Sequence, residues 1–134
     1  MNHIKSIVKI FVVVLGLGWG VGSNAQQTYP NKPIRLVVPF PPGGAVDFFA
    51  RVVQPPLAEI LGQPIVIDNK AGASGMIGAE LVSKSPADGY TLLLGNIASL
   101  AINVGIYPKM AYDPIKDFTP VIRTVDVNYG TVIK

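Results

Sequence analysis

The 134-residue sequence contains no cysteine and a single histidine, His3. Without cysteine the chain can form no disulfide, no thiolate metal site and no thiol nucleophile. Only 14% of the residues are charged and the formal net charge is +3. With no run of basic residues, this composition gives no support for a nucleic-acid partner. The 49% hydrophobic content excludes a disordered tail and fits one modest folded domain.

The first 25 residues have the parts of a secretory signal peptide. Lys5 and Lys9 precede an uncharged stretch over residues 10–22, and the small residues Ser23 and Ala25 fit cleavage after Ala25. A membrane-spanning helix needs about 20 apolar residues, so an uncleaved anchor is the weaker alternative. We therefore predict that residues 1–25 are removed on export and that the protein acts in the periplasm.

Cleavage would change the chemistry available to the exported chain. It removes His3, Lys5 and Lys9, which leaves nine basic residues against eight acidic ones and no histidine. A Ser-His-acid triad, a histidine metal site and a histidine general base are then excluded. We expect neither a metal nor a cofactor.

The exported part alternates short β-branched runs with segments of helical periodicity. These predict, in order, a strand at 33–39, a helix at 47–61, a strand at 64–68, a helix at 76–84, a strand at 90–94 and a short helix at 97–104. Strand, helix, strand, helix, strand predicts an α/β fold with a parallel sheet. In the second helix we expect Ile77 and Leu81 to face the core.

Two prolines conflict with the first predicted helix. Gly62 is a typical stop after Leu61, but Pro55 and Pro56 lie inside the periodic segment. An interior proline costs about 3 kcal/mol, because it lacks the N–H and clashes with the preceding turn. We expect the helix either to break after Val53 and restart at a proline or to kink strongly.

Three loops should follow the carboxyl ends of the strands, over residues 39–44, 69–75 and 95–99. Each is rich in glycine, proline or small polar residues and leads into a helix, where backbone N–H groups lack internal partners and attract an anion. The sequence therefore predicts a small-anion site at this edge of the sheet. The alternative is that these residues only make turns and that Asp47 only complements the helix dipole.

A dinucleotide site is a weaker interpretation of the second loop. The segment from Ala73 to Gly78 differs from the G-x-G-x-x-G fingerprint in having Ala73 at the first glycine. Gly95 and Asn96 stand after the next strand, where a ribose-binding acid is expected. The sequence has no G-x-x-x-x-G-K-[ST] motif, which excludes a P-loop ATPase.

Four blocks of the sequence resemble one known family. They are residues 29–44 (YPNKPIRLVVPFPPGG, with Asp47 shortly after), 62–80 (GQPIVIDNKAGASGMIGAE), 87–95 (ADGYTLLLG) and 112–120 (YDPIKDFTP). In order and spacing they resemble the substrate-binding proteins of tripartite tricarboxylate transporters, the Bug-type periplasmic receptors. The resemblance runs through nearly all of residues 29–134.

The resemblance implies a type II periplasmic-binding-protein-like fold, a Venus flytrap of two α/β lobes. It further implies a monomeric receptor, not an enzyme, that captures a small di- or tricarboxylate or a related metabolite and delivers it to membrane permease subunits. The residues that the resemblance places at the ligand lie in the three loops: Phe40, Pro41, Gly43, Gly44 and Asp47; Gly72, Ser74 and Gly75; Asn96 and Ser99.

The resemblance also divides the chain. Residues 26–120 correspond to the N-terminal part of the first lobe, and residues 121–134 to the crossover and the start of the second lobe. Because members of the family are much longer, we expect a truncated chain with only most of the first lobe present. Its sheet would lack a returning strand and keep an exposed edge, so we expect residues 26–134 alone to fold poorly and not to close on a ligand.

Two other functions stay open at this point. One is a secreted serine-dependent α/β hydrolase that uses Ser74 or Ser99 with a lysine or an acid as its base. The other is a periplasmic sensor partner that presents its ligand to a signalling receptor instead of a permease.

Overall fold

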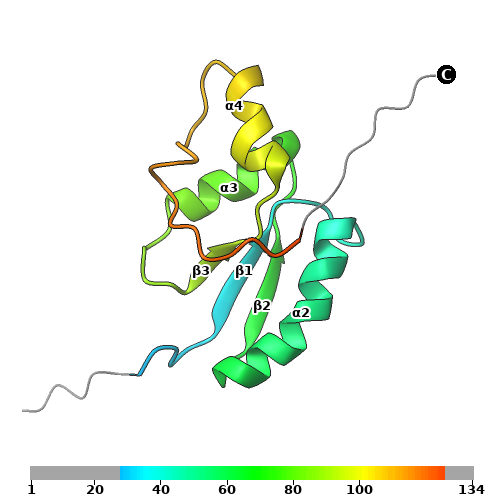
Figure 1. The fold of residues 1–134 in the computed structure, drawn as a ribbon, viewed down its shortest axis with the longest axis vertical. Helices are drawn as coiled ribbons and strands as arrows, with labels where there is room; N and C mark the ends of the chain where they lie inside the picture. Colours follow the sequence, from blue (N-terminus) through cyan, green and yellow to red (C-terminus); the bar gives the residue numbers. More distant parts are fainter. Residues whose placement is uncertain (1–27, 126–134) are drawn as a thin grey trace, which may run out of the picture.

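A three-stranded parallel sheet lies at the centre of the computed structural model, which describes residues 28–125 (Figure 1). The elements, in chain order, are β1 (Ile34–Val38), α2 (Ala45–Leu61), β2 (Ile65–Asn69), a 3₁₀ turn (Ala73–Gly75), α3 (Met76–Ser83), β3 (Thr91–Leu93), a π-helical turn (Ala98–Ile102) and α4 (Asn103–Ile106). The predicted signal peptide at residues 1–25 lies outside the described residues, as do residues 126–134. None of the described helices has the length and hydropathy needed to cross a membrane.

The strand order confirms the predicted α/β organisation. The strands run β2-β1-β3, and both neighbours pair with β1 in parallel. At the carboxyl ends, Val38 of β1 lies opposite Asn69 of β2. On the other side, Val37 lies opposite Leu93 of β3. The chain passes from β1 to β2 on one side and then crosses to β3 on the other, so the strand order reverses at β1. In open α/β sheets, ligands bind beyond the carboxyl ends at such a reversal.

Both faces of β1 are buried. Ile34, Leu36 and Val38 pack with Ala50 of α2 in one buried cluster. Val37 is also fully buried and, by the alternation of a strand, points to the opposite face. Figure 1 shows α3 and α4 on the side of the sheet away from α2. The carboxyl end of β1 therefore lies between two helical layers, as a strand buried on both faces requires.

Helix α2 continues through both prolines, so of the two expected outcomes, a break after Val53 or a strong kink, the break is wrong. It is a single helix with Pro55 and Pro56 inside. Each proline leaves a carbonyl of the preceding turn without its usual N–H donor, but both prolines are exposed, so water can reach these carbonyls. The helix ends as predicted, because Gly62 has a φ of 65° and its N–H donates to the Glu59 carbonyl.

Small residues make the contact between α3 and the sheet. Gly78 and Ala79 are buried, whereas Ile77 is 50% exposed, so the prediction that Ile77 faces the core is wrong; Leu81 is half-buried. A Cβ added to Gly78 would lie 2.8 Å from the Cβ and 2.9 Å from the Cα of Pro39. Helix α3 thus approaches the end of β1 so closely that a larger residue does not fit there.

We expect Gly78→Ala to lower the free energy of unfolding by about 1–3 kcal/mol, the usual cost of overpacking a filled contact. The reason is that the Cα and Cβ of Pro39 lie less than 3 Å from the position that the new methyl group would take. Gly105→Ala is the control, since nothing lies within 4 Å of a Cβ at that position of α4 and alanine is favoured in helices. Urea denaturation measures both variants. Equal stabilities would contradict the close packing of α3.

Candidate functional site

The three predicted loops meet at the carboxyl edge of the sheet. They are called loop 1 (residues 39–44), loop 2 (residues 69–75) and loop 3 (residues 95–99) below. Gly75, at the end of loop 2, is buried between the other two. A Cβ on Gly75 would lie 3.1 Å from Ser99 Cβ in loop 3 and 3.3 Å from Phe40 Cζ in loop 1. Three stretches far apart in sequence are therefore in contact, as their common position after parallel strands requires.

A buried carboxylate fixes loop 1. Asp47 lies in the first turn of α2 and is 2% exposed. Its Oδ2 accepts the Gly43 N–H at 2.9 Å and Arg51 Nε at 2.8 Å. Its Oδ1 accepts Asn69 Nδ2 at 2.9 Å, and the same nitrogen donates to the Phe40 carbonyl at 3.1 Å. Loop 1 is thereby tied at both ends, to α2 and to the end of β2.

The donors around Asp47 keep it ionised. The hydrogen bond from Arg51 is the strongest effect that holds the pKa of Asp47 well below its usual range; Gly43 and Asn69 add to it, and burial opposes it. Asp47 therefore does more than complement the helix dipole, because its carboxylate accepts hydrogen bonds from Gly43, Arg51 and Asn69. Contact between Asp47 and a ligand stays a prediction. Asn69 was missed by the sequence analysis, and its position at the carboxyl end of β2 was the available signal.

The hydrogen bonds of loop 1 leave the free donors at the start of α2 rather than at the glycines. The Gly43 N–H is taken by the carboxylate, and the Gly44 N–H makes a long contact of 3.4 Å with the Pro41 carbonyl. Among the described residues, no acceptor bonds the N–H groups of Ala45 and Val46, and no side chain caps α2. These two amides carry the positive end of the helix dipole at the edge of the sheet.

Loop 2 has positive φ angles at four consecutive residues. The φ angles are 132° at Gly72, 47° at Ala73, 53° at Ser74 and 87° at Gly75. The Gly75 N–H donates to the Gly72 carbonyl at 3.0 Å, and the Ser74 carbonyl accepts Asn103 Nδ2 at 3.1 Å. Ser74 is exposed, and its Oγ has no hydrogen-bond partner within residues 28–125. That hydroxyl is therefore available to a ligand.

Loop 3 is closed on itself. The Asn96 N–H donates to Ser99 Oγ at 3.2 Å, and the Ser99 N–H donates to Asn96 Oδ1 at 3.1 Å, a reciprocal pattern like that of a capping box. Ser99 is fully buried, and its carbonyl accepts the Tyr112 hydroxyl. In the described part of the chain, the N–H groups of Ile97 and Ala98 have no acceptor. The two predicted side chains thus build the loop, and its free donors are the amides between them.

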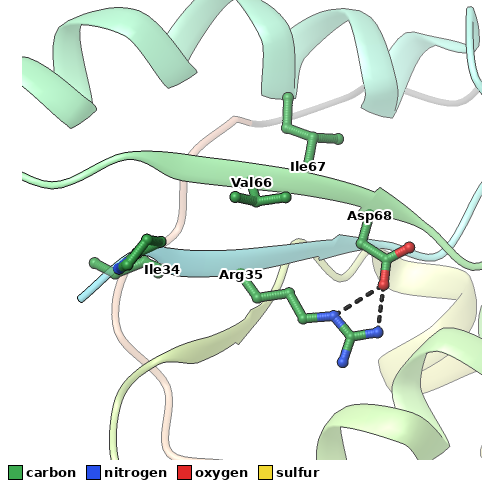
Figure 2. Close-up of a pocket in the computed structure, with 6 residues that line it drawn as sticks. Ile34, Arg35, Val66, Ile67 and Asp68 are labelled. Atoms are coloured by element: carbon green, nitrogen blue, oxygen red, sulfur yellow. Dashed lines mark hydrogen bonds and ion pairs between the residues drawn. The ribbon is translucent and has the colours of Figure 1, made fainter.

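A separate hollow of about 360 Å³ lies on the sheet, away from the three loops. It is lined by Pro33, Ile34, Arg35, Val66, Ile67 and Asp68. Figure 2 shows Arg35 of β1 reaching toward Asp68 of β2, to which its Nε donates at 2.8 Å. This contact holds the pKa of Asp68 below its usual value despite burial, with Lys70 adding to the effect. None of the ten predicted ligand residues lines the hollow, so it is not the predicted site.

The edge formed by the loops offers neutral donors and few catalytic groups. The nearby cations are paired: Arg51 with Asp47 at 2.8 Å and Lys70 with Asp68 at 3.3 Å. No cluster of three or more histidine, cysteine or acidic side chains that could hold a metal occurs within residues 28–125. The hydroxyl of Ser99 is bonded inside its own loop. This arrangement is suited to holding an anion through backbone dipoles.

Comparison with known proteins identifies similar chains. The sequence model of TctC, the tripartite tricarboxylate transporter family receptor, matches residues 49–134. BugT of Bordetella pertussis is 42% identical over 128 residues, which are 95% of this chain and 38% of BugT.

Two solved structures share the fold. MatC from Rhodopseudomonas palustris, with bound malate, has a TM-score of 0.67 at 43% identity and covers 69% of this chain and 32% of its own. A second protein of that organism, with adipate, has a TM-score of 0.62 at 46% identity and covers 70% of this chain and 31% of its own. The chain thus spans about a third of the length of the proteins that it matches.

We expect Asp47→Asn to destabilise the protein at neutral pH and the loss to shrink in acid. Because the native pKa of Asp47 is lowered, its stabilising effect is fully present above the unfolded pKa of about 3.9. The effect is lost as the pH falls through the lower native pKa, since the unfolded chain takes up the proton first. Urea midpoints of the wild type and the variant, measured from neutral to strongly acidic pH, test this.

The matched control is Glu59→Gln, at an exposed acid of the same helix, which should shift the midpoint little at any pH. A wild-type advantage over Asp47→Asn that stays constant into strong acid would contradict the ionised network around loop 1.

Proposed function

The chain belongs to the tripartite tricarboxylate transporter receptor family, and on this premise we propose that it forms the carboxylate-holding part of an extracytoplasmic solute receptor. The family resemblance of the four sequence blocks and the expected periplasmic-binding-protein fold are both confirmed. Because the chain spans about a third of its relatives, the activity, ligand and partners of the whole receptor all belong to this proposal.

The observation that carries the proposal is the set of N–H groups beside loops 1 and 3 that have no acceptor within residues 28–125. Loop 1 leads to the amides of Ala45 and Val46, and loop 3 offers those of Ile97 and Ala98. Loop 2 adds the hydroxyl of Ser74. Hydrogen bonds to an ionised group contribute about 1.5–3 kcal/mol each, and a helix N-terminus adds about 0.3–2 kcal/mol. Several such donors are enough to hold one carboxylate.

The ligands of two neighbours support the ligand class. MatC was solved with malate and a second R. palustris protein with adipate, and both ligands are dicarboxylates. We therefore propose that one end of a dicarboxylate or related small carboxylate lies against the three loops. Asp47, Asn96 and Ser99 shape these loops, while the backbone of the glycine-rich segments approaches the ligand.

We propose that the receptor acts in the periplasm as a monomer and delivers its ligand to membrane permease subunits. Family membership and the signal-peptide pattern of residues 1–25 support this. The proposal includes no cofactor, no nucleic acid and no catalysis. The serine hydrolase is the weaker alternative, because Ser99 Oγ is bonded within loop 3 and, within residues 28–125, no base is hydrogen-bonded to the Ser74 hydroxyl. A sensor partner would use the same edge and differ in the protein that receives the ligand.

We expect Ala45→Pro to weaken dicarboxylate binding by about tenfold or more, the equivalent of one charge-assisted hydrogen bond. Proline removes the Ala45 N–H yet suits the first position of a helix. The preceding residue, Gly44, has φ −77° and ψ 168°, which a following proline tolerates. Titration calorimetry of the whole receptor with malate, succinate and adipate measures the affinity, since residues 26–134 alone are not expected to close on a ligand.

Ala45→Ser, which keeps the amide, is the matched control and should bind almost as tightly as the wild type. Thermal unfolding should show that both variants remain folded. Unchanged affinity in Ala45→Pro, or an equal loss in Ala45→Ser, would contradict a role for this amide. Absence of binding by the wild type to all three dicarboxylates would contradict the proposed ligand class.

A further inference from the structure

We propose that Asn103 is a positioning residue that holds loop 2 in its left-handed conformation and so sets the place of the loop 2 donors. Asn103 begins α4 and is 2% exposed. Its Nδ2 reaches across to loop 2 and donates to the Ser74 carbonyl at 3.1 Å. The inference rests on the proposed function in one respect, namely that loop 2 contacts the ligand.

Loop 2 needs a restraint because two of its residues carry side chains in a region that favours glycine. Ala73 has a φ of 47° and Ser74 a φ of 53°. There the Cβ crowds the backbone, and such residues persist where their surroundings hold them. The bond inside the turn joins the Gly75 N–H to the Gly72 carbonyl and leaves the Ser74 carbonyl free. Within the described chain, the Asn103 amide is the donor that fixes that carbonyl.

Asn103 is itself held by loop 3 and by the segment after α4. The π-helical turn at Ala98–Ile102 leaves Ser99 and Asn103 both buried, at 0% and 2% exposure. Tyr112 is 6% exposed, its hydroxyl donates to the Ser99 carbonyl, and its ring packs edge-on against Phe118 at 5.7 Å. Turns of the π type occur often at functional sites. The Asn103 side chain also interacts with the Tyr112 hydroxyl, where it opposes the rise in the Tyr112 pKa that burial causes, so the segment after α4 contacts Asn103 as well as loop 3.

This role makes a specific prediction about rescue. If Asn103 acts on the backbone of loop 2, its loss should matter less when that backbone is adopted without steric cost. Glycine at position 73 removes part of the cost, because glycine takes a positive φ freely. A packing role for Asn103 predicts no rescue, since the cavity left by Asn103→Ala would be the same in both backgrounds.

The test compares Asn103→Ala, Ala73→Gly and the double variant in the whole receptor. Hydrogen exchange of the Gly75 amide reports on the turn, and calorimetric titration with succinate reports on binding. We expect Asn103→Ala to speed Gly75 exchange and to raise the succinate Kd, each by about fivefold to tenfold, as for one lost hydrogen bond. Adding Asn103→Ala to the Ala73→Gly variant should change the logarithm of the exchange rate and of the Kd by about half, or less, of what Asn103→Ala causes in the wild type. Such a reduced effect is the sign of coupling between the two positions.

Val104→Ala, at an exposed neighbour on α4, is the control and should change neither measurement. Equal losses in the single and double variants would overturn the proposal. If Asn103→Ala does not fold, Asn103→Asp replaces it, because it keeps the side-chain volume and loses the amide donor. Failure of both to fold with Ala73→Gly present would also overturn the proposal.

The two proposals fail separately. If the wild type binds no succinate but Gly75 exchange follows the expected pattern, the positioning role of Asn103 stands and the ligand class is contradicted. If the wild type binds succinate but the double variant shows no rescue, the ligand class stands and the role of Asn103 is contradicted.

Discussion

The buried carboxylate of Asp47 ties together the first loop, helix α2 and the end of β2. It accepts the Gly43 N–H, the Arg51 guanidinium and the Asn69 amide, and Asn69 in turn holds the Phe40 carbonyl. A buried charge with this many donors is costly to move, because any lost partner leaves it unsatisfied. Loop 1 is therefore set before a ligand arrives, and the start of α2 keeps its free amides at one place on the sheet edge.

Ion pairs within the protein occupy the cations near the loops and leave neutral donors for a ligand. Arg51 is bound to Asp47, and Arg35 and Lys70 share Asp68. The groups left at the loops are neutral donors, whose strength comes from fixed orientation and from helix dipoles rather than from net charge. If a carboxylate binds there as proposed, its affinity should depend less on salt than at a lysine or arginine site, since the nearby Arg51 and Lys70 are already paired with acids.

Local patterns predicted the order of the elements, the stop at Gly62 and the common edge of the three loops, because periodicity and turn chemistry are properties of short segments. They did not reveal the part that Asn69 or Asn103 plays, since each acts on a carbonyl 29 positions away in sequence. Periodicity also wrongly placed the side chain of Ile77 in the core. The close contact with Pro39 is made by the neighbouring Gly78 instead. The second lobe expected from residue 121 stays a prediction: residues 121–125 form no helix or strand, and 126–134 lie outside the described chain.

The most direct measurement is an amide NMR titration of the whole receptor with succinate. Carboxylate binding by the loops predicts that the N–H signals of Ala45, Val46, Ile97 and Ala98 shift together with those of loop 2 and saturate at one Kd. Shifts confined to the hollow between β1 and β2, at Arg35 and Val66, would place the ligand elsewhere and contradict the account.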